Sequence, residues 1–91
     1  MSEKRILTTR ETFALAVDNH QKNNLQAAEN FYKETLKANP NYADAHNNLG
    51  IVFKELGELQ KAVDCYQKLI QIQPDDSYAY YNLGFVFKEL G

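Results

Sequence analysis

The sequence predicts an all-α protein built from repeated helix-turn-helix hairpins, and two observations lead to this prediction. First, Asn48–Gly57 and Asn82–Gly91 share the pattern N-L-G-x-V-F-K-E-L-G, differ only at the fourth residue, and lie 34 residues apart. A match at a fixed offset of about 20–50 residues is the signature of a solenoid or another repeat array. Second, apolar residues recur every three or four positions, and no segment alternates with a period of two, so strands are not expected.

The same offset relates single residues outside this decapeptide. The pairs are Leu25 with Leu59, Ala28 with Ala62, Tyr32 with Tyr66, Pro40 with Pro74, and Asn41 with Asp75. The repeat therefore extends over whole hairpins.

The first hairpin is expected between about Thr9 and Pro40. Its first helix ends near Lys22, where two asparagines break the apolar pattern. Asn24 suits the N-cap of the second helix, because its side chain can accept a hydrogen bond from a free backbone N–H. Pro40 ends that helix, since the residue before a proline is disfavoured in the helical region. Residues 1–8 carry no pattern, and we expect a frayed lead-in there.

The second hairpin and the fifth helix have their own boundary residues. Asn41 can cap the third helix, and Gly57 suits its end because glycine accepts a left-handed backbone at little cost. Pro74 closes the fourth helix, and Asp75 or Asp76 caps the fifth.

Two glycines lie within helices, where each costs about 1 kcal/mol relative to alanine. Gly50 and Gly84 both fall on the apolar stripe of their helix. We expect Gly50 to allow a close approach of small Ala62 on the next helix, with Tyr66 filling the space one turn further along.

Composition and charge exclude several classes of protein. The chain has 91 residues and a formal net charge of −2, so it lacks the basic surface of a nucleic-acid or membrane-surface binder. Cys65 is the single cysteine, which excludes an internal disulfide. No apolar run is long enough for a secretory signal or a membrane span. We therefore expect a soluble, cytoplasmic module without nucleic-acid or membrane partners.

No residue pattern indicates catalysis or a cofactor. His20 and His46 have no cysteine or carboxylate cluster at metal-ligand spacing. His46 holds a bulky packing position, for which we expect a core role. Phosphate-binding loops and nucleophile elbows are missing from the sequence. The prediction is a protein that is not an enzyme and has no metal or cofactor.

Between His46 and Pro74 the chain has the order H-x-x-L-G-x-x-F, then A-x-x-x-Y, then P. This spacing resembles the 34-residue tetratricopeptide repeat. The resemblance covers about residues 9–91, which divide into repeats 9–42 and 43–76 and a half repeat, 77–91. The first copy is degenerate, because Asn19 stands where the pattern has an aromatic residue.

The resemblance implies a right-handed α-solenoid whose concave groove binds a peptide or protein segment without catalysis. The groove residues it implies are Asp44, Asn47, Asn48, Ile51, Tyr78, Tyr81, Asn82 and Phe85. An asparagine amide both donates and accepts, so Asn48 and Asn82 would hold a peptide backbone. The alternative for these asparagines is a solvated face, and the alternative for the aromatic residues is packing against a following helix.

The fifth helix is apolar around most of its circumference, and such a helix needs cover on more than one side. We expect it to drive self-association, most simply as a two-fold dimer. The residues expected in that contact are Tyr78, Tyr81, Phe85, Val86 and Leu90. Two alternatives remain open: this is the N-terminal piece of a longer repeat array, or the scaffold part of a longer enzyme.

Overall fold

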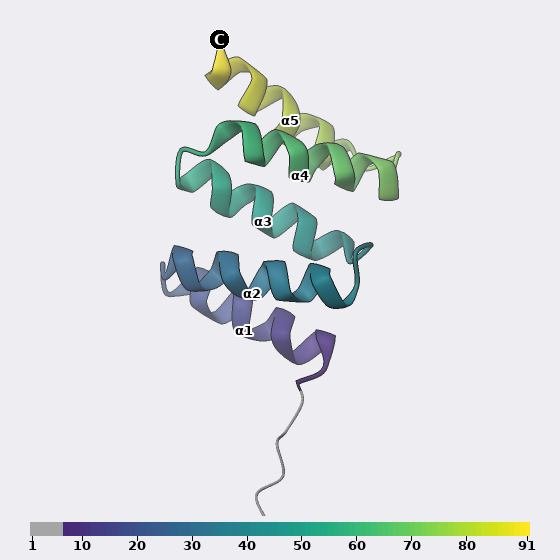
Figure 1. Ribbon diagram of the computed structural model, residues 1–91. Helices are drawn as coiled ribbons and strands as arrows, with labels where there is room; N and C mark the ends of the chain where they lie inside the picture. The colour runs from purple at the N-terminus through teal and green to yellow at the C-terminus, as the bar shows by residue number, and fades with distance from the viewer. Residues whose placement is uncertain (1–6) are drawn as a thin grey trace, which may run out of the picture.

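A computed structural model describes residues 7–91 of the chain, which form five helices stacked in chain order (Figure 1). The helices are α1 (Thr9–Gln21), α2 (Leu25–Ala38), α3 (Ala43–Glu55), α4 (Leu59–Ile72) and α5 (Ser77–Leu90). Each helix packs mainly against the helices before and after it in the chain, and the described residues contain no strand. The predicted all-α solenoid of helical hairpins is confirmed.

The start of α1 is fixed by a capping box. The Thr8 hydroxyl oxygen accepts a hydrogen bond from the Glu11 N–H at 3.1 Å, and the Glu11 carboxylate accepts one from the Thr8 N–H at 3.1 Å. Thr8, which we had assigned to the lead-in, therefore belongs to the cap of α1. Leu7 of that lead-in is exposed and lies outside α1, and residues 1–6 lie outside the described residues.

The remaining helix ends follow the predicted signals with two corrections. Gly57 has a φ of 77°, and the Asp76 side chain accepts a hydrogen bond from the Ala79 N–H at 3.1 Å, so both residues act as expected. Tyr42, and not Asn41, occupies the N-cap of α3. Asn24 does occupy the N-cap of α2, but its side chain makes no capping hydrogen bond.

One core runs the length of the stack, with alanines at close helix contacts and two tyrosines as the largest fully buried side chains. Its members include Ala16, Ala28, Tyr32, Ala45, Leu49, Val52, Phe53, Ala62, Val63, Cys65, Tyr66 and Val86. Successive helices share this core, so their packing sets the positions of α1, α3 and α5 relative to one another.

The core explains Gly50 through Tyr66, which is the residue expected to fill the space beside it. A Cβ built on Gly50 would lie 2.7 Å from the Tyr66 ring, far inside van der Waals contact. Glycine is therefore required by the buried ring of Tyr66.

His46 is half-buried and is not a core residue, which corrects a second expectation. Its Nε2–H donates to the Pro40 carbonyl oxygen at 2.7 Å. The ring thus ties the first turn of α3 to the preceding loop.

Candidate functional site

The predicted groove residues differ widely in exposure. Asp44, Tyr78, Tyr81 and Phe85 are exposed, Asn47, Asn48 and Ile51 are half-buried, and Asn82 is buried. Residues 34 apart occupy equivalent places in successive repeats, so Asn48 and Asn82 belong to one row of side chains along the stack. The exposed members of the set are concentrated on α5.

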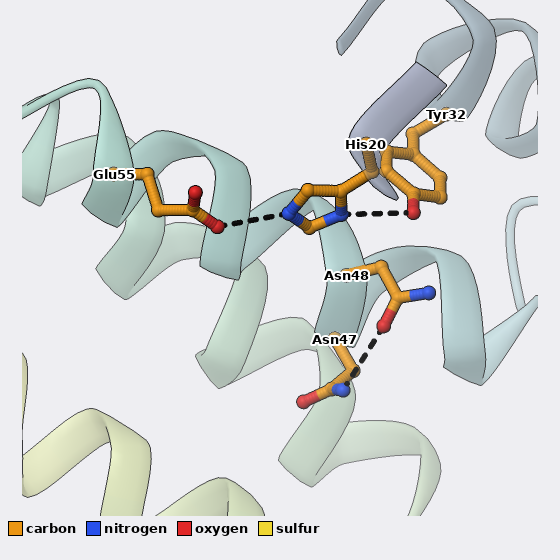
Figure 2. Close-up of polar contacts among 5 residues, drawn as sticks. All are labelled: His20, Tyr32, Asn47, Asn48 and Glu55. Carbon is orange, nitrogen blue, oxygen red and sulfur yellow. Dashed lines mark hydrogen bonds and ion pairs between the residues drawn. The ribbon is translucent and has the colours of Figure 1, made fainter. Parts of the chain in front are cut away.

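A polar contact between α1, α2 and α3 lies beside this row (Figure 2). His20 Nδ1 lies 3.2 Å from the Tyr32 hydroxyl, and His20 Nε2 lies 2.8 Å from the Glu55 carboxylate. The His20 Nε2–H donates to the Glu55 carboxylate, and the His20 Nδ1 and the Tyr32 hydroxyl share the second hydrogen bond. Burial raises the pKa of Tyr32, an effect that the Asn48 amide opposes and the Glu55 carboxylate reinforces. The first repeat thus provides its buried tyrosine with a partner.

The two adjacent asparagines on α3 interact with each other. Asn47 Nδ2 donates to Asn48 Oδ1 at 3.3 Å (Figure 2). The remaining oxygen of Asn47, its Oδ1, is buried and has no hydrogen-bond partner among the described residues. An amide acceptor therefore remains unused in the middle of the row.

The second repeat leaves its tyrosine without a partner. Tyr66 corresponds to Tyr32, but Lys54 stands where the first repeat has His20, and the Lys54 Nζ lies 5.1 Å from the Phe85 ring centroid. Within the described residues the Tyr66 hydroxyl and Asn82 Nδ2 are buried and make no hydrogen bond. Burial raises the pKa of Tyr66 to about 12.

Three helices thus contribute one unpartnered polar atom each: an amide oxygen from α3, a hydroxyl from α4 and an amide nitrogen from α5. The Tyr66 ring lies against Gly50 of α3, so its side chain extends from α4 toward that helix. Sequence reasoning identified Asn47 and Asn82 but treated Tyr66 only as packing. The change from His20 to Lys54 at the repeat offset was the signal that could have revealed its unpaired hydroxyl.

The exposed apolar surface of α5 is extensive, and one predicted member is not part of it. Val86 is fully buried in the core, so it cannot contribute to a contact between folded chains. The exposed large apolar side chains of α5 are Tyr78, Tyr80, Tyr81, Phe85, Phe87 and Leu90. Several of them border an open hollow of about 400 Å³, which is lined by Tyr80, Tyr81, Gly84, Phe85 and Lys88.

Residues 7–91 lack two further features. These residues contain no group of three or more His, Cys, Asp and Glu side chains arranged to hold a metal ion. None of the five helices described has the length and apolarity needed to cross a membrane.

Family comparison matches most of the repeat region. A family model described as "TPR repeat" matches residues 52–91, and one described as "Tetratricopeptide repeat" matches residues 31–64. Together the two matches span residues 31–91 without a gap. Comparison with curated protein sequences finds no match.

Solved structures of similar shape cover nearly all of the chain. A structure titled "Crystal structure of MamA" is 31% identical with a TM-score of 0.90, over 92% of this chain and 49% of that one. A second, "Crystal structure of MamA protein", is 31% identical with a TM-score of 0.87, over 89% and 44%. The "Arabidopsis OM64 TPR domain" is 26% identical with a TM-score of 0.85, over 90% and 68%. The chain thus spans about half the length of the MamA structures it matches.

Proposed function

Because this chain belongs to the tetratricopeptide repeat family over residues 31–91, we propose that it is a non-catalytic scaffold that binds a peptide or protein segment in its groove. The family and the structural neighbours support the broader role in protein–protein interaction. The binding surface in this proposal is formed by the predicted groove residues of α3 and α5.

The observation that carries the proposal is the set of three buried polar atoms without partners. Buried polar groups are almost always hydrogen-bonded, and each exception calls for a water or a ligand. A peptide group supplies one donor and one acceptor. Its carbonyl oxygen would accept from the Tyr66 hydroxyl or Asn82 Nδ2, and its N–H would donate to Asn47 Oδ1.

The surroundings of these atoms suit a bound segment as well. Tyr78 and Tyr81 are 63% and 71% exposed, so their rings are available to contact a bound segment. Aromatic residues are the most common anchors in protein interfaces. Together with Ile51 and Phe85 they would contact the side chains of the segment, while the polar atoms hold its backbone.

The proposal can be tested with a phage-displayed library of random 12-residue peptides selected on the whole chain. We expect clones that bind saturably and lose about tenfold or more in affinity when Asn82→Ala or Tyr66→Phe is introduced. The matched control is Gln71→Ala on exposed α4 surface, which should leave binding unchanged. Clones that bind both groove variants as well as the unchanged protein would refute groove binding through these atoms.

A second candidate is self-association through α5, and a specific observation favours it. Six large apolar side chains of one helix are exposed, and large exposed apolar patches often mark interfaces between proteins. A two-fold contact through Tyr78, Tyr81, Phe85 and Leu90 would cover part of that surface. Light scattering behind a sizing column should then show a dimer that dissociates on Phe85→Asp substitution. A monomer at every concentration would exclude this candidate.

A further inference from the structure

The first repeat contains a cluster of four polar side chains, which we call the first tyrosine layer. Its members are His20, Tyr32, Asn48 and Glu55. Figure 2 shows the His20 ring between its two partners, with Nδ1 at 3.2 Å from the Tyr32 hydroxyl and Nε2 at 2.8 Å from the Glu55 carboxylate. Burial raises the pKa of the same hydroxyl, and a hydrogen bond with the Asn48 amide opposes the rise. In this layer an imidazole therefore joins a buried hydroxyl to a carboxylate.

The second repeat has the same layer with one member changed. This second tyrosine layer, 34 residues further along the chain, consists of Lys54, Tyr66, Asn82 and Glu89. Only the lysine differs in type from its counterpart. The shared decapeptide carries the asparagine and the glutamate of each layer, seven residues apart on α3 and again on α5. Since α5 packs on α4 as α3 packs on α2, the hydroxyl, the amide and the carboxylate lie at equivalent places in the two layers.

Lys54 does not take the place of the imidazole. Its Nζ lies 5.1 Å from the Phe85 ring centroid, and it forms no ion pair with the exposed Glu89. An ammonium group has three donors and no acceptor, so it cannot accept a hydrogen bond from the Tyr66 hydroxyl or from Asn82 Nδ2. Both of these atoms are buried without a partner among the described residues. The second layer therefore lacks a group that offers one donor and one acceptor.

We propose that a histidine side chain of the segment bound in the groove completes the second tyrosine layer. The inference rests on the proposed function and specifies one residue of the ligand. One nitrogen of the ring donates to the Glu89 carboxylate, and the other shares a hydrogen bond with the Tyr66 hydroxyl, as His20 does in the first layer. Lys54 moves aside on its flexible stem and gives up no hydrogen bond or ion pair with the described residues.

This arrangement gives each of the three unpartnered atoms its own role. The Tyr66 hydroxyl holds the histidine ring. Asn82 Nδ2 donates to a carbonyl oxygen of the bound segment, and Asn47 Oδ1 accepts from one of its N–H groups. The segment is then held by its backbone at α3 and α5 and by one side chain at α4.

Other side chains fit the second layer less well. A carboxylate would be repelled by Glu89, and lysine or arginine has no acceptor for the Tyr66 hydroxyl. Glutamine and asparagine offer a donor and an acceptor, but both atoms lie at one end of a flexible chain. An imidazole carries its donor and its acceptor at separate positions of a rigid ring, and this is the geometry that the first layer uses.

The test uses the whole chain and the clones selected from the random 12-residue library, at about pH 8 so that histidine is neutral. The buffer contains EDTA, because histidine readily binds metal ions. We expect the binding clones to share a histidine. In fluorescence anisotropy with labelled peptides, replacing that histidine by alanine should weaken binding about tenfold or more.

Lys54→His in the protein provides the complementary variant. It supplies the imidazole from α3, as His20 supplies it from α1. The histidine peptide and its alanine version should then bind this variant with equal affinity. Lys37→His on exposed α2 surface is the matched control and should discriminate between the two peptides as the unchanged chain does.

The same variant tests the geometry of the layer without any peptide. If the space between Tyr66 and Glu89 accepts an imidazole, Lys54→His should have a higher urea midpoint than Lys54→Gln, which lacks the ring. Addition of Glu89→Ala should remove that difference, because the donor nitrogen of the ring loses its acceptor. Equal midpoints for Lys54→His and Lys54→Gln would mean that the layer does not hold an imidazole, and the proposal would be wrong.

Two binding results would also overturn the proposal. The first is a set of clones that depends on Asn82 and Tyr66 but shares no histidine, in which case the groove proposal stands and the histidine contact does not. The second is a histidine peptide that keeps its advantage over the alanine version on Lys54→His, because its ring must then bind elsewhere. Absence of any saturable clone would refute the groove proposal, and the histidine contact would fall with it.

Discussion

The helices α3 and α5 carry almost the same ten residues in two different environments. Phe53 on α3 is 4% exposed, whereas Phe87 at the equivalent position of α5 is 49% exposed. A Cβ on Gly50 would collide with the Tyr66 ring, whereas one on Gly84 would meet nothing within 4 Å. The shared sequence produces the same helix twice, but the energetic role of each side chain depends on whether a following helix covers it. A comparison of equivalent substitutions in α3 and α5 therefore measures how much the packing of a following helix contributes.

The largest difference is expected for removal of the two phenylalanines. Phe53→Ala should cost about 3–5 kcal/mol, because it leaves a cavity between α3 and α4 and removes a ring that two lysines approach. Phe87→Ala should cost less than about 1 kcal/mol, since the ring is half exposed. Urea unfolding followed by circular dichroism measures both values. Similar losses for the two variants would mean that α5 is covered in solution, and the comparison would fail.

The next largest effect is expected at alkaline pH, which should lower the free energy of unfolding through two buried residues of α4. Burial raises the pKa of the Cys65 thiol from 9.0 to about 12 and that of the Tyr66 hydroxyl from 10.0 to about 12. Above pH 9 the unfolded chain releases protons that the folded chain retains, so unfolding becomes more favourable as the pH rises. The loss should begin near pH 9, continue toward pH 12, and reach about 2 kcal/mol or more.

Urea midpoints measured between pH 8 and about pH 11 would follow this loss. The control is Cys65→Ala, which should remove the part that begins near pH 9 and keep the part that begins near pH 10 with Tyr32 and Tyr66, since burial raises the pKa of both tyrosines. If the variant and the unchanged chain lose stability in parallel from pH 9 upward, the thiol is not the group responsible.

The two glycines should respond to alanine with opposite signs. Gly50→Ala places a methyl group 2.7 Å from the fully buried Tyr66 ring, and such overpacking typically costs about 1–3 kcal/mol. Gly84→Ala adds the methyl group to open space and should stabilise α5 by about 0.5–1 kcal/mol, because alanine favours a helix. Thermal unfolding of the pair checks the signs. A loss of stability in Gly84→Ala would show that another group occupies the space above that glycine.

The sequence was sufficient for the fold because the repeat determines it through local signals. The glycine at the end of α3 and the proline after α4 act within a few residues of where they stand, and the 34-residue offset shows that the same signals recur along the chain. These signals placed the five helices. Local reasoning was less reliable for the caps, since Asn41 and Tyr42 are neighbours and only the backbone path decides which one becomes the N-cap.

Contacts between helices were harder to predict. Periodicity shows which side of a helix is buried, but it does not show which residue of the facing helix makes the closest contact. At Gly50 both Ala62 and Tyr66 were expected nearby, and the atoms nearest to a Cβ built there belong to Tyr66. The contact of His20 with Tyr32 and Glu55 joins three helices, so it depends on side-chain directions that no spacing in the sequence contains.

The two buried tyrosines provide the last and smallest test of how similar the repeats are. The Tyr32 hydroxyl has the His20 ring as its partner, whereas the Tyr66 hydroxyl has none among the described residues. A hydrogen bond contributes about 0.5–1.5 kcal/mol net, and an unpartnered buried hydroxyl is unfavourable. Tyr32→Phe should therefore lower the free energy of unfolding by about 1 kcal/mol, and Tyr66→Phe should leave it unchanged or raise it slightly.

Urea unfolding of both variants, combined with peptide binding, separates two explanations for the free hydroxyl. If Tyr66→Phe keeps its stability but loses peptide affinity, the hydroxyl is reserved for a ligand. If Tyr66→Phe loses as much stability as Tyr32→Phe, an ordered water already serves as its partner, because a water in that place is nearly as good a partner as a protein group. In that case the second repeat replaces His20 of the first with solvent, and the backbone contact would depend on Asn47 and Asn82 alone.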